Sequence, residues 1–362
     1  MPSHRETDQE LEVRLKNHLA QITAPNEAIR ALAAQREDDL AKPRKSLGRL
    51  EELAIQLASI QNTFSPRYEK KLIVVCAGDH GVVEEGVSPY PSDVTIAQIA
   101  NFQQGGGAIT SLARATGSDL ILLDVGIKGD LAPHPTRVDA KIAHGTKNIA
   151  KGPAMTRKEA LLSVLTGLEL VLGRHEIDLV TAGEMGIGNT TPSSCIVSLL
   201  TGQTPLEATG PGSGLSPERI AHKAAIVQKA LEVNKPDPKD PIDVLAKVGG
   251  FEIGAMAGVY LGGAIRRAGV VIDGFIGAAA ALLAQGLSPG ITKYLIAGHR
   301  SKEKAHLETL KRLGLTPLLD LGLYLGEGSG AVVAFGVLQC ACAHFNGMRT
   351  LAEAQVSDTI LT

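Results

Sequence analysis

The chain of 362 residues is 44% hydrophobic and 20% charged, a composition that allows a large buried core in one large domain or two ordinary ones. A formal net charge of -2 without a long block of one sign gives no electrostatic footprint for nucleic acid or anionic membrane. The absence of Trp and an aromatic content of 3% argue against a base-stacking surface. Residues 1–20 are polar and lack the apolar core of a secretion signal, so we expect a soluble, cytoplasmic protein.

The beginning of the chain differs from the rest. Residues 1–60 are charged and helix-like and contain no strand-like run. We expect them to form a small helical domain together with residues 336–362. The remaining segment, residues 61–335, is then expected to form one α/β domain.

From residue 71 onward one unit recurs along the chain: a short apolar run, a glycine with a polar group, and then a helix-like pattern. The apolar runs lie at residues 71–80, 119–128 and 177–186, and begin again at Gly269 and Lys293. Near-continuous apolar strands that alternate with helices predict a parallel sheet covered on both faces. We therefore expect an α/β fold of the doubly wound class and not a barrel.

Helix start signals lie between these strands. Thr156 and Glu159 have the spacing of a capping box, and Ser216 followed by Pro217 opens another helix. Residues 236–241, PDPKDP, form a rigid polar break after that second helix.

Two apolar stretches could be taken for a membrane span and for a metal site. Residues 253–285 are interrupted by two arginines and an aspartate, so they predict a buried helix, strand and helix and not a membrane span. Cys340, Cys342 and His344 suggest a metal cluster, but residues two apart do not face one another on a helix. We expect a core helix there, and the four cysteines of the chain fit a reducing compartment.

The most informative segment is IDLVTAGEMGIGNTT, residues 177–191, in which an apolar run ends in Glu184 among glycines and hydroxyls. Ligands of open α/β sheets lie beyond the carboxyl ends of the strands, and free N–H groups at a helix start bind phosphate. We therefore expect an anion site here. The glycine spacing differs from the dinucleotide pattern GxGxxG and no Walker lysine follows, so NAD or ATP binding is weakly supported. The alternative is that the glycines only allow tight packing of the strand against the helix.

Other glycine-rich segments carry further candidates. TGPGSGL, residues 209–215, precedes a helix whose apolar stripe is flanked by Lys223, which either points into a pocket or lies on the surface with its stem buried. Glu327 lies between two glycines before an apolar helix, where it either caps that helix or approaches a ligand. Asp79 and His80 pose the same ambiguity after the first strand.

These motifs resemble the nicotinate-nucleotide:dimethylbenzimidazole phosphoribosyltransferase family. The resemblance extends from about residue 42 to residue 335 and is carried, in the family's order, by AGDHGV, GVSPYPSDVT, NFQQGGGAI, GTKNIAKGPAM, GEMGIGNTTP, TGPGSGL, VGGFEIGAMAG, IDGFIGAAAA, AGHRS and LGEGSGA. The segment KPRKSLGRLEEL also resembles the family's KPxGSLGxLE pattern, except that Lys45 stands where glycine is expected.

The resemblance implies a Rossmann-like parallel sheet with a small helical domain, and a homodimer. It also implies transfer of the phosphoribosyl group of nicotinate mononucleotide to 5,6-dimethylbenzimidazole, which gives α-ribazole 5'-phosphate and nicotinate for the lower ligand of cobalamin. By the family's pattern, Glu327 is the catalytic base, while Glu184 and Lys223 lie at the substrate site.

The chemistry of this reaction explains why one carboxylate suffices as the catalytic group. The pyridinium leaving group becomes neutral as the glycosidic bond breaks, so it needs no general acid. The benzimidazole attacks through one ring nitrogen and loses the proton of the other, which a carboxylate within hydrogen-bond reach can accept. We expect Glu327 to have that role, and partial burial would raise the pKa of such a base. Glu184 would either bind a ribose hydroxyl or stabilise positive charge at the anomeric carbon.

The remaining candidates bind the two small-molecule substrates. The phosphate-binding candidates are Gly186, Gly188, Asn189, Thr190, Gly212 and Lys223. A planar heterocycle needs an apolar slot with a few polar groups, and the candidates for it are Ser88, Tyr90, Pro91 and Gln98. No cofactor or metal is expected, because a monophosphate and a cationic leaving group require no divalent ion.

Two other functions remain open on the sequence. A nucleotide-dependent oxidoreductase could use the same fold, although the GxGxxG spacing is missing. A phosphosugar-binding sensor would have similar pockets, but it would have no need for Glu327.

Overall fold

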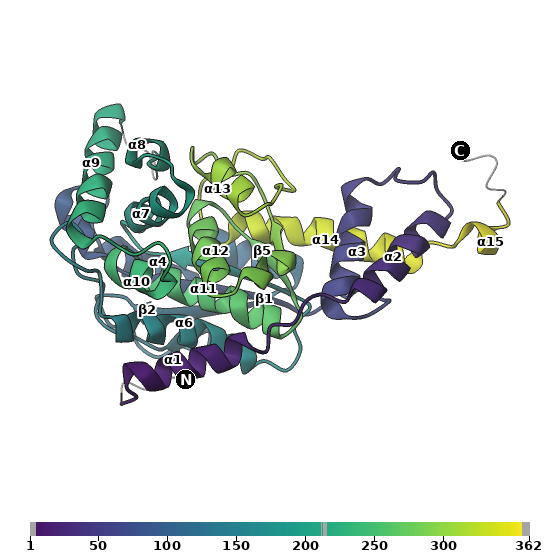
Figure 1. Cartoon of the computed structure of the whole chain (residues 1–362), viewed down its shortest axis with the longest axis horizontal. Coiled ribbons are helices and arrows are strands. Elements are labelled where there is room, and N and C mark those ends of the chain that lie inside the picture. The colour runs from purple at the N-terminus through teal and green to yellow at the C-terminus, as the bar shows by residue number, and fades with distance from the viewer. Residues whose placement is uncertain (1–4, 211, 213–215, 357–362) are drawn as a thin grey trace.

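The computed structural model describes residues 5–210, 212 and 216–356 (Figure 1). Six strands form one sheet in the order β3-β2-β1-β4-β5-β6, and all neighbouring pairs are parallel. The strands are β1 Lys71–Gly78, β2 Asp119–Gly126, β3 Arg137–Asp139, β4 Leu179–Met185, β5 Gly269–Ile272 and β6 Leu295–Ala297. This order is that of the doubly wound Rossmann fold, so the predicted fold class is confirmed.

The strand order reverses between β1 and β4. The chain builds β2 and β3 outward on one side of β1 and then crosses to β4 on the other side. Ligands of open α/β sheets bind in the crevice at such a point. The register pairs Cys76 with Glu184 and Ala77 with Met185, so the polar residues that follow both strands meet at the same edge of the sheet.

Helices cover both faces of the sheet, as Figure 1 shows. Alternate side chains of β1 enter two separate hydrophobic clusters, Val74 on one face and Val75 on the other, as the two-residue period of a strand requires. The helices of the first cluster include α6 Arg157–Leu172, α11 Phe251–Ile265 and α12 Phe275–Leu287, and those of the second include α3 Arg49–Gln61, α5 Ala108–Thr116 and α14 Ser329–Gly347.

The other helices of the described chain surround or connect this core. They are α1 Asp8–Leu19, α2 Glu27–Asp39, η1 Gly81–Glu85, α4 Asp93–Gln103, α7 Thr190–Thr201, α8 Pro205–Ala208, α9 Pro217–Asn234, α10 Pro241–Val248, η2 Pro289–Tyr294, α13 His306–Arg312 and α15 Leu351–Ala354.

The local helix signals of the sequence are present in the structure. Thr156 and Glu159 form the predicted capping box at the start of α6, because each side chain accepts a backbone N–H of the other residue. The α9 helix begins at Pro217, as predicted. The polar break at residues 236–241 contains Asp240, whose side chain caps α10.

The two apolar stretches also form the predicted elements. Residues 253–285 comprise most of α11, the strand β5 and most of α12. The α14 helix is long and apolar enough to cross a membrane by length and composition alone, but 50% of its most apolar window is buried within the protein, as in the core helix of a folded domain. Cys342 is buried in this helix, Cys340 is exposed, and His344 bonds through Nε2 to Oε1 of Glu37 at 2.8 Å.

The helices near the two ends of the chain do not all pack together. The α2 and α3 helices lie beside the second half of α14 at one end of the molecule (Figure 1), where Nε of Arg36 donates to the carbonyl of Phe345. The α1 helix instead packs against α6, and Arg14 forms an ion pair with Glu169 at 2.7 Å. The division into residues 1–60 plus 336–362 and residues 61–335 therefore stays a prediction, with α1 in contact with the α/β part.

The structure also accounts for the departure at Lys45. This residue has a φ of 61°, in the left-handed region that glycine adopts without steric cost. The backbone thus makes the turn for which the family pattern has glycine, although a lysine occupies the position.

Candidate active site

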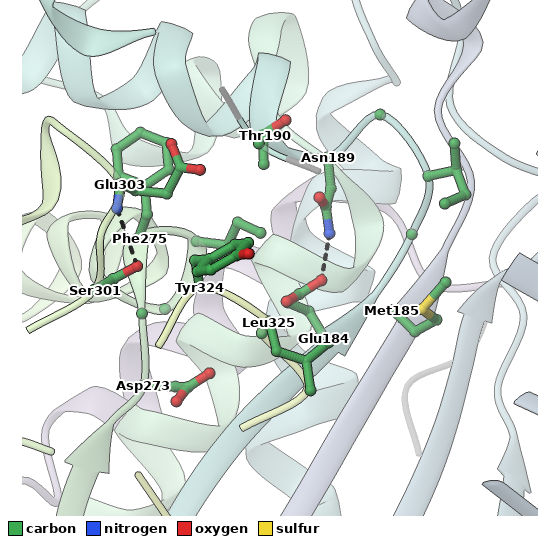
Figure 2. A pocket seen from close by; sticks show the side chains of 18 of the residues that line it. Glu184, Met185, Asn189, Thr190, Asp273, Phe275, Ser301, Glu303, Tyr324 and Leu325 are labelled. Carbon is green, nitrogen blue, oxygen red and sulfur yellow. Dashed lines mark hydrogen bonds between the residues drawn. The ribbon is translucent and has the colours of Figure 1, made fainter. Parts of the chain in front are cut away.

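A cavity of about 180 Å³ lies at the carboxyl ends of β4, β5 and β6, beside the point where the strand order reverses (Figure 2). It is lined by Val87, Ser88, Glu184, Met185, Gly186, Ile187, Gly188, Asn189, Thr190, Gly212, Lys223, Met256, Asp273, Gly274, Phe275, Ile276, Gly277, His299, Ser301, Glu303, Tyr324, Leu325 and Gly326. The cavity therefore joins segments that are far apart in the sequence.

The structure brings most of the predicted site residues together in this cavity. Those that line it are Ser88, Glu184, Gly186, Gly188, Asn189, Thr190, Gly212 and Lys223. Those outside the lining are Tyr90, Pro91, Gln98 and Glu327. Tyr90 and Pro91 are exposed on the loop before α4, and Gln98 lies on α4, where it accepts a hydrogen bond from Asn101.

Glu184 is the buried polar centre of the site, with only 8% of its surface exposed. Its Oε2 accepts a hydrogen bond from Nδ2 of Asn189 at 2.5 Å, and its Oε1 accepts the backbone N–H of Glu327 at 3.3 Å. Burial raises the pKa of Glu184 to about 8, and the hydrogen bond from Asn189 opposes that rise only in part. This carboxyl group is therefore mostly protonated at neutral pH.

Glu327 contacts Glu184 through its backbone N–H, and its own backbone is strained. Its φ is 64°, and the flanking Gly326 and Gly328 have φ values of 90° and 88°. A non-glycine residue in the left-handed region persists only where its surroundings hold it, and such residues cluster at functional sites. The side chain is 8% exposed, and its Oε2 accepts the N–H of Ile109 in the first turn of α5 at 3.3 Å. Burial raises the pKa of Glu327, while this hydrogen bond opposes the rise.

A glycine of β4 makes room for this loop. A Cβ atom on Gly183 would lie 2.1 Å from the carbonyl oxygen of Glu327 and 2.7 Å from the backbone nitrogen of Gly328. Neither is a side-chain atom that could rotate away. The close approach of the strand and the loop that places Glu184 next to Glu327 therefore depends on Gly183.

Lys223 also lines the cavity and is 1% exposed. Its Nζ donates to Oγ1 of Thr190, the first residue of α7, at 2.6 Å. Burial lowers the pKa of Lys223 to about 8, although the nearby charge of Glu303 opposes this. A buried ammonium group beside a helix start and a glycine-rich loop has the composition of an anion site.

The second glycine-rich loop reaches the same place. Gly212 has a φ of 53°, and a Cβ atom on it would lie 3.5 Å from Oγ1 of Thr190 and 3.6 Å from Nζ of Lys223. Residue 211 and residues 213–215 of this predicted loop lie outside the described residues.

The sequence did not single out several residues of the cavity. Asp273 and Phe275 lie in the motif IDGFIG, and His299, Ser301 and Glu303 lie in or just after AGHRS. The available signal was position, because Asp273 and His299 follow the ends of β5 and β6 as Glu184 ends β4. Figure 2 shows Asp273 and Glu184 on neighbouring sides of the cavity.

Asp79 and His80, the ambiguous pair after β1, lie outside the cavity lining. Oδ2 of Asp79 accepts the N–H of Lys128 at 2.8 Å, so this residue caps a loop. Nε2 of His80 lies 2.7 Å from Oε1 of Glu252, and both side chains are buried beneath the glycine-rich loop after β4. Within residues 5–210, 212 and 216–356, no group of three or more His, Cys, Asp or Glu side chains could hold a metal ion.

Comparison with known proteins identifies the class of protein to which this fold and site belong. A family model described as phosphoribosyltransferase matches residues 22–356, and the chain belongs to that family. Among its members, the chain is similar to those named nicotinate-nucleotide--dimethylbenzimidazole phosphoribosyltransferase. It is 47% identical to the protein of Desulforudis audaxviator over 345 residues, which cover 95% of this chain and 98% of the relative. It is 46% identical to that of Chloroflexus aggregans, with coverages of 94% and 97%.

A solved structure agrees with these relatives. The crystal structure of the nicotinate-nucleotide-dimethylbenzimidazole phosphoribosyltransferase of Thermus thermophilus matches with a TM-score of 0.87 at 42% sequence identity. The match covers 92% of this chain and 99% of that chain.

Proposed function

We propose that this phosphoribosyltransferase transfers the phosphoribosyl group of nicotinate mononucleotide to 5,6-dimethylbenzimidazole. The products are α-ribazole 5'-phosphate and nicotinate, and the first serves the lower ligand of cobalamin. The names of the relatives support this reaction. The observation that carries the proposal is the pair of hydrogen bonds to Glu184, which come from Asn189 of the glycine-rich loop and from the backbone of Glu327. They join an anion-binding loop to a second buried carboxylate.

The donor phosphate binds at the start of α7. An ammonium group has three donors, and within the described part of the chain Nζ of Lys223 uses one of them, toward Thr190. A phosphate takes the remaining donors, together with N–H groups of the glycine-rich loops. The residues proposed for this subsite are Gly186, Gly188, Asn189, Thr190, Gly212 and Lys223.

The acceptor base binds between this cavity and Glu327. Ser88 lines the cavity, and its Oγ accepts the backbone N–H of Tyr90 at 3.1 Å. This contact supports the proposal that the segment from Ser88 to Pro91 helps to bind the base. The residues proposed to hold the benzimidazole are Ser88, Tyr90, Pro91 and Gln98. Tyr90 and Pro91 are exposed beside this segment, so in this proposal they move toward the cavity when the base binds.

The reaction then needs one proton acceptor. A ring nitrogen of the benzimidazole forms a bond to the anomeric carbon, the bond to the pyridinium nitrogen breaks, and its electron pair leaves with nicotinate. The second ring nitrogen gives its proton to Glu327, the catalytic base. Because burial raises the pKa of Glu184 to about 8, this carboxyl group is better suited at neutral pH to bind a ribose hydroxyl than to balance a positive charge.

We also propose that the enzyme is a cytoplasmic homodimer. Leu321, Tyr324 and Leu325 are each more than half exposed near the cavity, which favours a surface that substrate or a partner covers. The four cysteines are unpaired, which is consistent with a reducing compartment.

The reaction is tested with the Glu327→Gln variant. Glutamine keeps the size of the side chain and can still accept the N–H of Ile109, but it cannot take a proton from the base. We expect kcat to fall by about 10²–10⁴-fold, the usual contribution of general base catalysis, with little change in the affinity for nicotinate mononucleotide. Mass spectrometry of the products measures turnover, and titration calorimetry measures donor binding.

The exposed Glu308 offers a matched control, since Glu308→Gln makes the same change outside the cavity lining and should leave kcat unchanged. Full activity of the Glu327→Gln variant would remove the assignment of the base. If the unaltered protein binds nicotinate mononucleotide but never releases nicotinate in the presence of dimethylbenzimidazole, the phosphosugar sensor is the better description.

A further inference from the structure

The strained loop that carries Glu327 is held by a carboxylate from another element. Oδ2 of Asp273, just after β5, accepts the N–H of Gly328 at 3.1 Å. Oδ1 of the same side chain accepts the N–H groups of Gly330 and Ala331 at 2.8 Å and 3.0 Å. These residues follow Glu327 directly and form the first turn of α14. Asp273 is 4% exposed, so these hydrogen bonds are well shielded from water.

The loop has no such support of its own. Gly328 stands at the N-cap of α14 and has no side chain to accept the free N–H groups of the first turn. The left-handed backbone of Glu327 is unfavourable for a residue with a side chain and persists only where neighbouring groups hold it. Gly183 packs against this loop through its backbone, and Asp273 holds the turn that follows.

We propose that Asp273 is a positioning residue for Glu327: by holding the N–H groups of residues 328, 330 and 331, it fixes the backbone that aims the Glu327 carboxylate at the acceptor base. The inference deepens the proposed function and rests on it. Asp273 itself takes no proton in the reaction and acts through the place and the basicity of Glu327.

The charge of Asp273 acts in the same direction as its hydrogen bonds. Burial raises the pKa of Glu327, the N–H of Ile109 opposes that rise, and the negative charge of Asp273 adds to it. The other titratable groups near Asp273 are Glu184 on β4, Tyr260 on α11, His306 on α13 and His299 after β6. Nε2 of His299 lies 3.4 Å from Oδ1 of Asp273. Asp273 therefore makes Glu327 a stronger base as well as a better-placed one.

Replacement of Asp273 by asparagine separates these effects from a general loss of structure. The amide oxygen can still accept from Gly330 and Ala331, but the NH₂ group then faces the N–H of Gly328. We expect kcat for product formation to fall on the order of 10²-fold, because misplacement of a reacting group by about 1 Å has an effect of that size. The KM for nicotinate mononucleotide should change far less. The acidic limb of the pH profile of kcat should move to lower pH, because the charge that raises the pKa of Glu327 is gone.

The Asp320→Asn variant is the matched control, since it removes the same charge from an exposed side chain paired with Arg300. It should leave both kcat and the acidic limb unchanged. Should Asp273→Asn not fold, as judged by near-ultraviolet circular dichroism, Asp273→Ser replaces it, because serine keeps one acceptor and removes the charge.

The possible outcomes are distinct. Unchanged kcat and an unmoved acidic limb in the folded variant would overturn the role of Asp273 while leaving the reaction in place. A large rise in the KM for nicotinate mononucleotide at constant kcat would overturn it as well, in favour of direct ribose binding. An unaltered protein that forms no α-ribazole 5'-phosphate would instead remove the proposed function, and the inference with it.

Discussion

At the scale of single residues, the site concentrates carboxyl groups that the fold holds away from water. Glu184 and Glu327 are both 8% exposed, and each has a raised pKa with burial as its first cause. A buried carboxyl group of this kind favours its neutral form, so its ionisation opposes folding. We therefore expect these two carboxyl groups to lower the free energy of unfolding of the protein when they are ionised.

Glu184 makes this expectation measurable. Its pKa rises from 4.5 to about 8 on folding, so between these pH values the folded chain retains a proton that the unfolded chain has released. The free energy of unfolding must then fall as pH rises through this window. We expect Glu184→Gln to flatten that fall, by an amount on the order of a few kcal/mol between about pH 5 and pH 8. Urea unfolding at a series of pH values gives the slope.

A matched control comes from Glu52, whose side chain is 70% exposed. Glu52→Gln should leave the slope as it is in the unaltered protein. The same slope in the Glu184→Gln variant would show that this carboxyl group is not kept neutral by the fold.

At Lys45 the family pattern predicts a backbone conformation although the residue itself differs from the pattern. The family pattern has glycine at this position, and the lysine there has a φ of 61°. The pattern therefore described the backbone conformation correctly even where the residue differs. The sequence could not show that the turn would be kept, because the cost of a left-handed lysine is small beside the contacts of the whole segment.

At the scale of elements, the site depends on the approach of β4 to the loop before α14. Both segments were predicted separately, from GEMGIGN and LGEGSG. Their contact was not predicted, because it depends on the glycine at 183, the capping of α14 by Asp273 and the parallel pairing of the strands. The short edge strand β3, Arg137–Asp139, was also missed, since three residues with little apolar content carry no periodic signal.

The Gly183→Ala variant tests this contact between elements. A methyl group there would lie 2.1 Å from the carbonyl oxygen of Glu327, so the loop has to move. We expect a loss of about 1–3 kcal/mol in the free energy of unfolding, as for overpacking in other cores, together with a strong fall in kcat. Denaturant unfolding and product formation measure the two effects.

The Gly336→Ala variant provides the comparison, because Gly336 lies in α14 and a Cβ atom on it would meet nothing within 4 Å. It should stabilise the helix slightly and leave kcat unchanged. An active, fully stable Gly183→Ala variant would contradict the close packing described for β4.

At the scale of the whole molecule, the topology decides where the site forms. The sheet places the ends of β4, β5 and β6 side by side, so Glu184, Asp273 and His299 line one cavity although they are widely separated along the chain. The α2 and α3 helices contribute no residue to the cavity lining. They lie at one end of the molecule, beside the second half of α14 (Figure 1).

The proposed homodimer belongs to this scale. If it forms, light scattering after gel filtration should give twice the 37.8 kDa mass of the single chain over a range of protein concentrations. A mass that stays at that of one chain at micromolar concentration would exclude a stable dimer.

The sequence by itself determined the strands at β1, β2, β4, β5 and β6, the helix caps and the class of the fold, because these depend on local periodicity and on short-range hydrogen bonds. It also singled out Glu184, Gly186 and Asn189 of the cavity, because they stand where an apolar strand ends. Only the tertiary structure decided that Asp273 holds the Glu327 loop, that Glu184 lies between that loop and Asn189, and that Tyr90, Pro91 and Gln98 lie outside the cavity lining. The contacts of Asp273 and Glu184 with the Glu327 loop join residues distant in the chain. Packing and burial determine such contacts, and they leave no local pattern in the sequence.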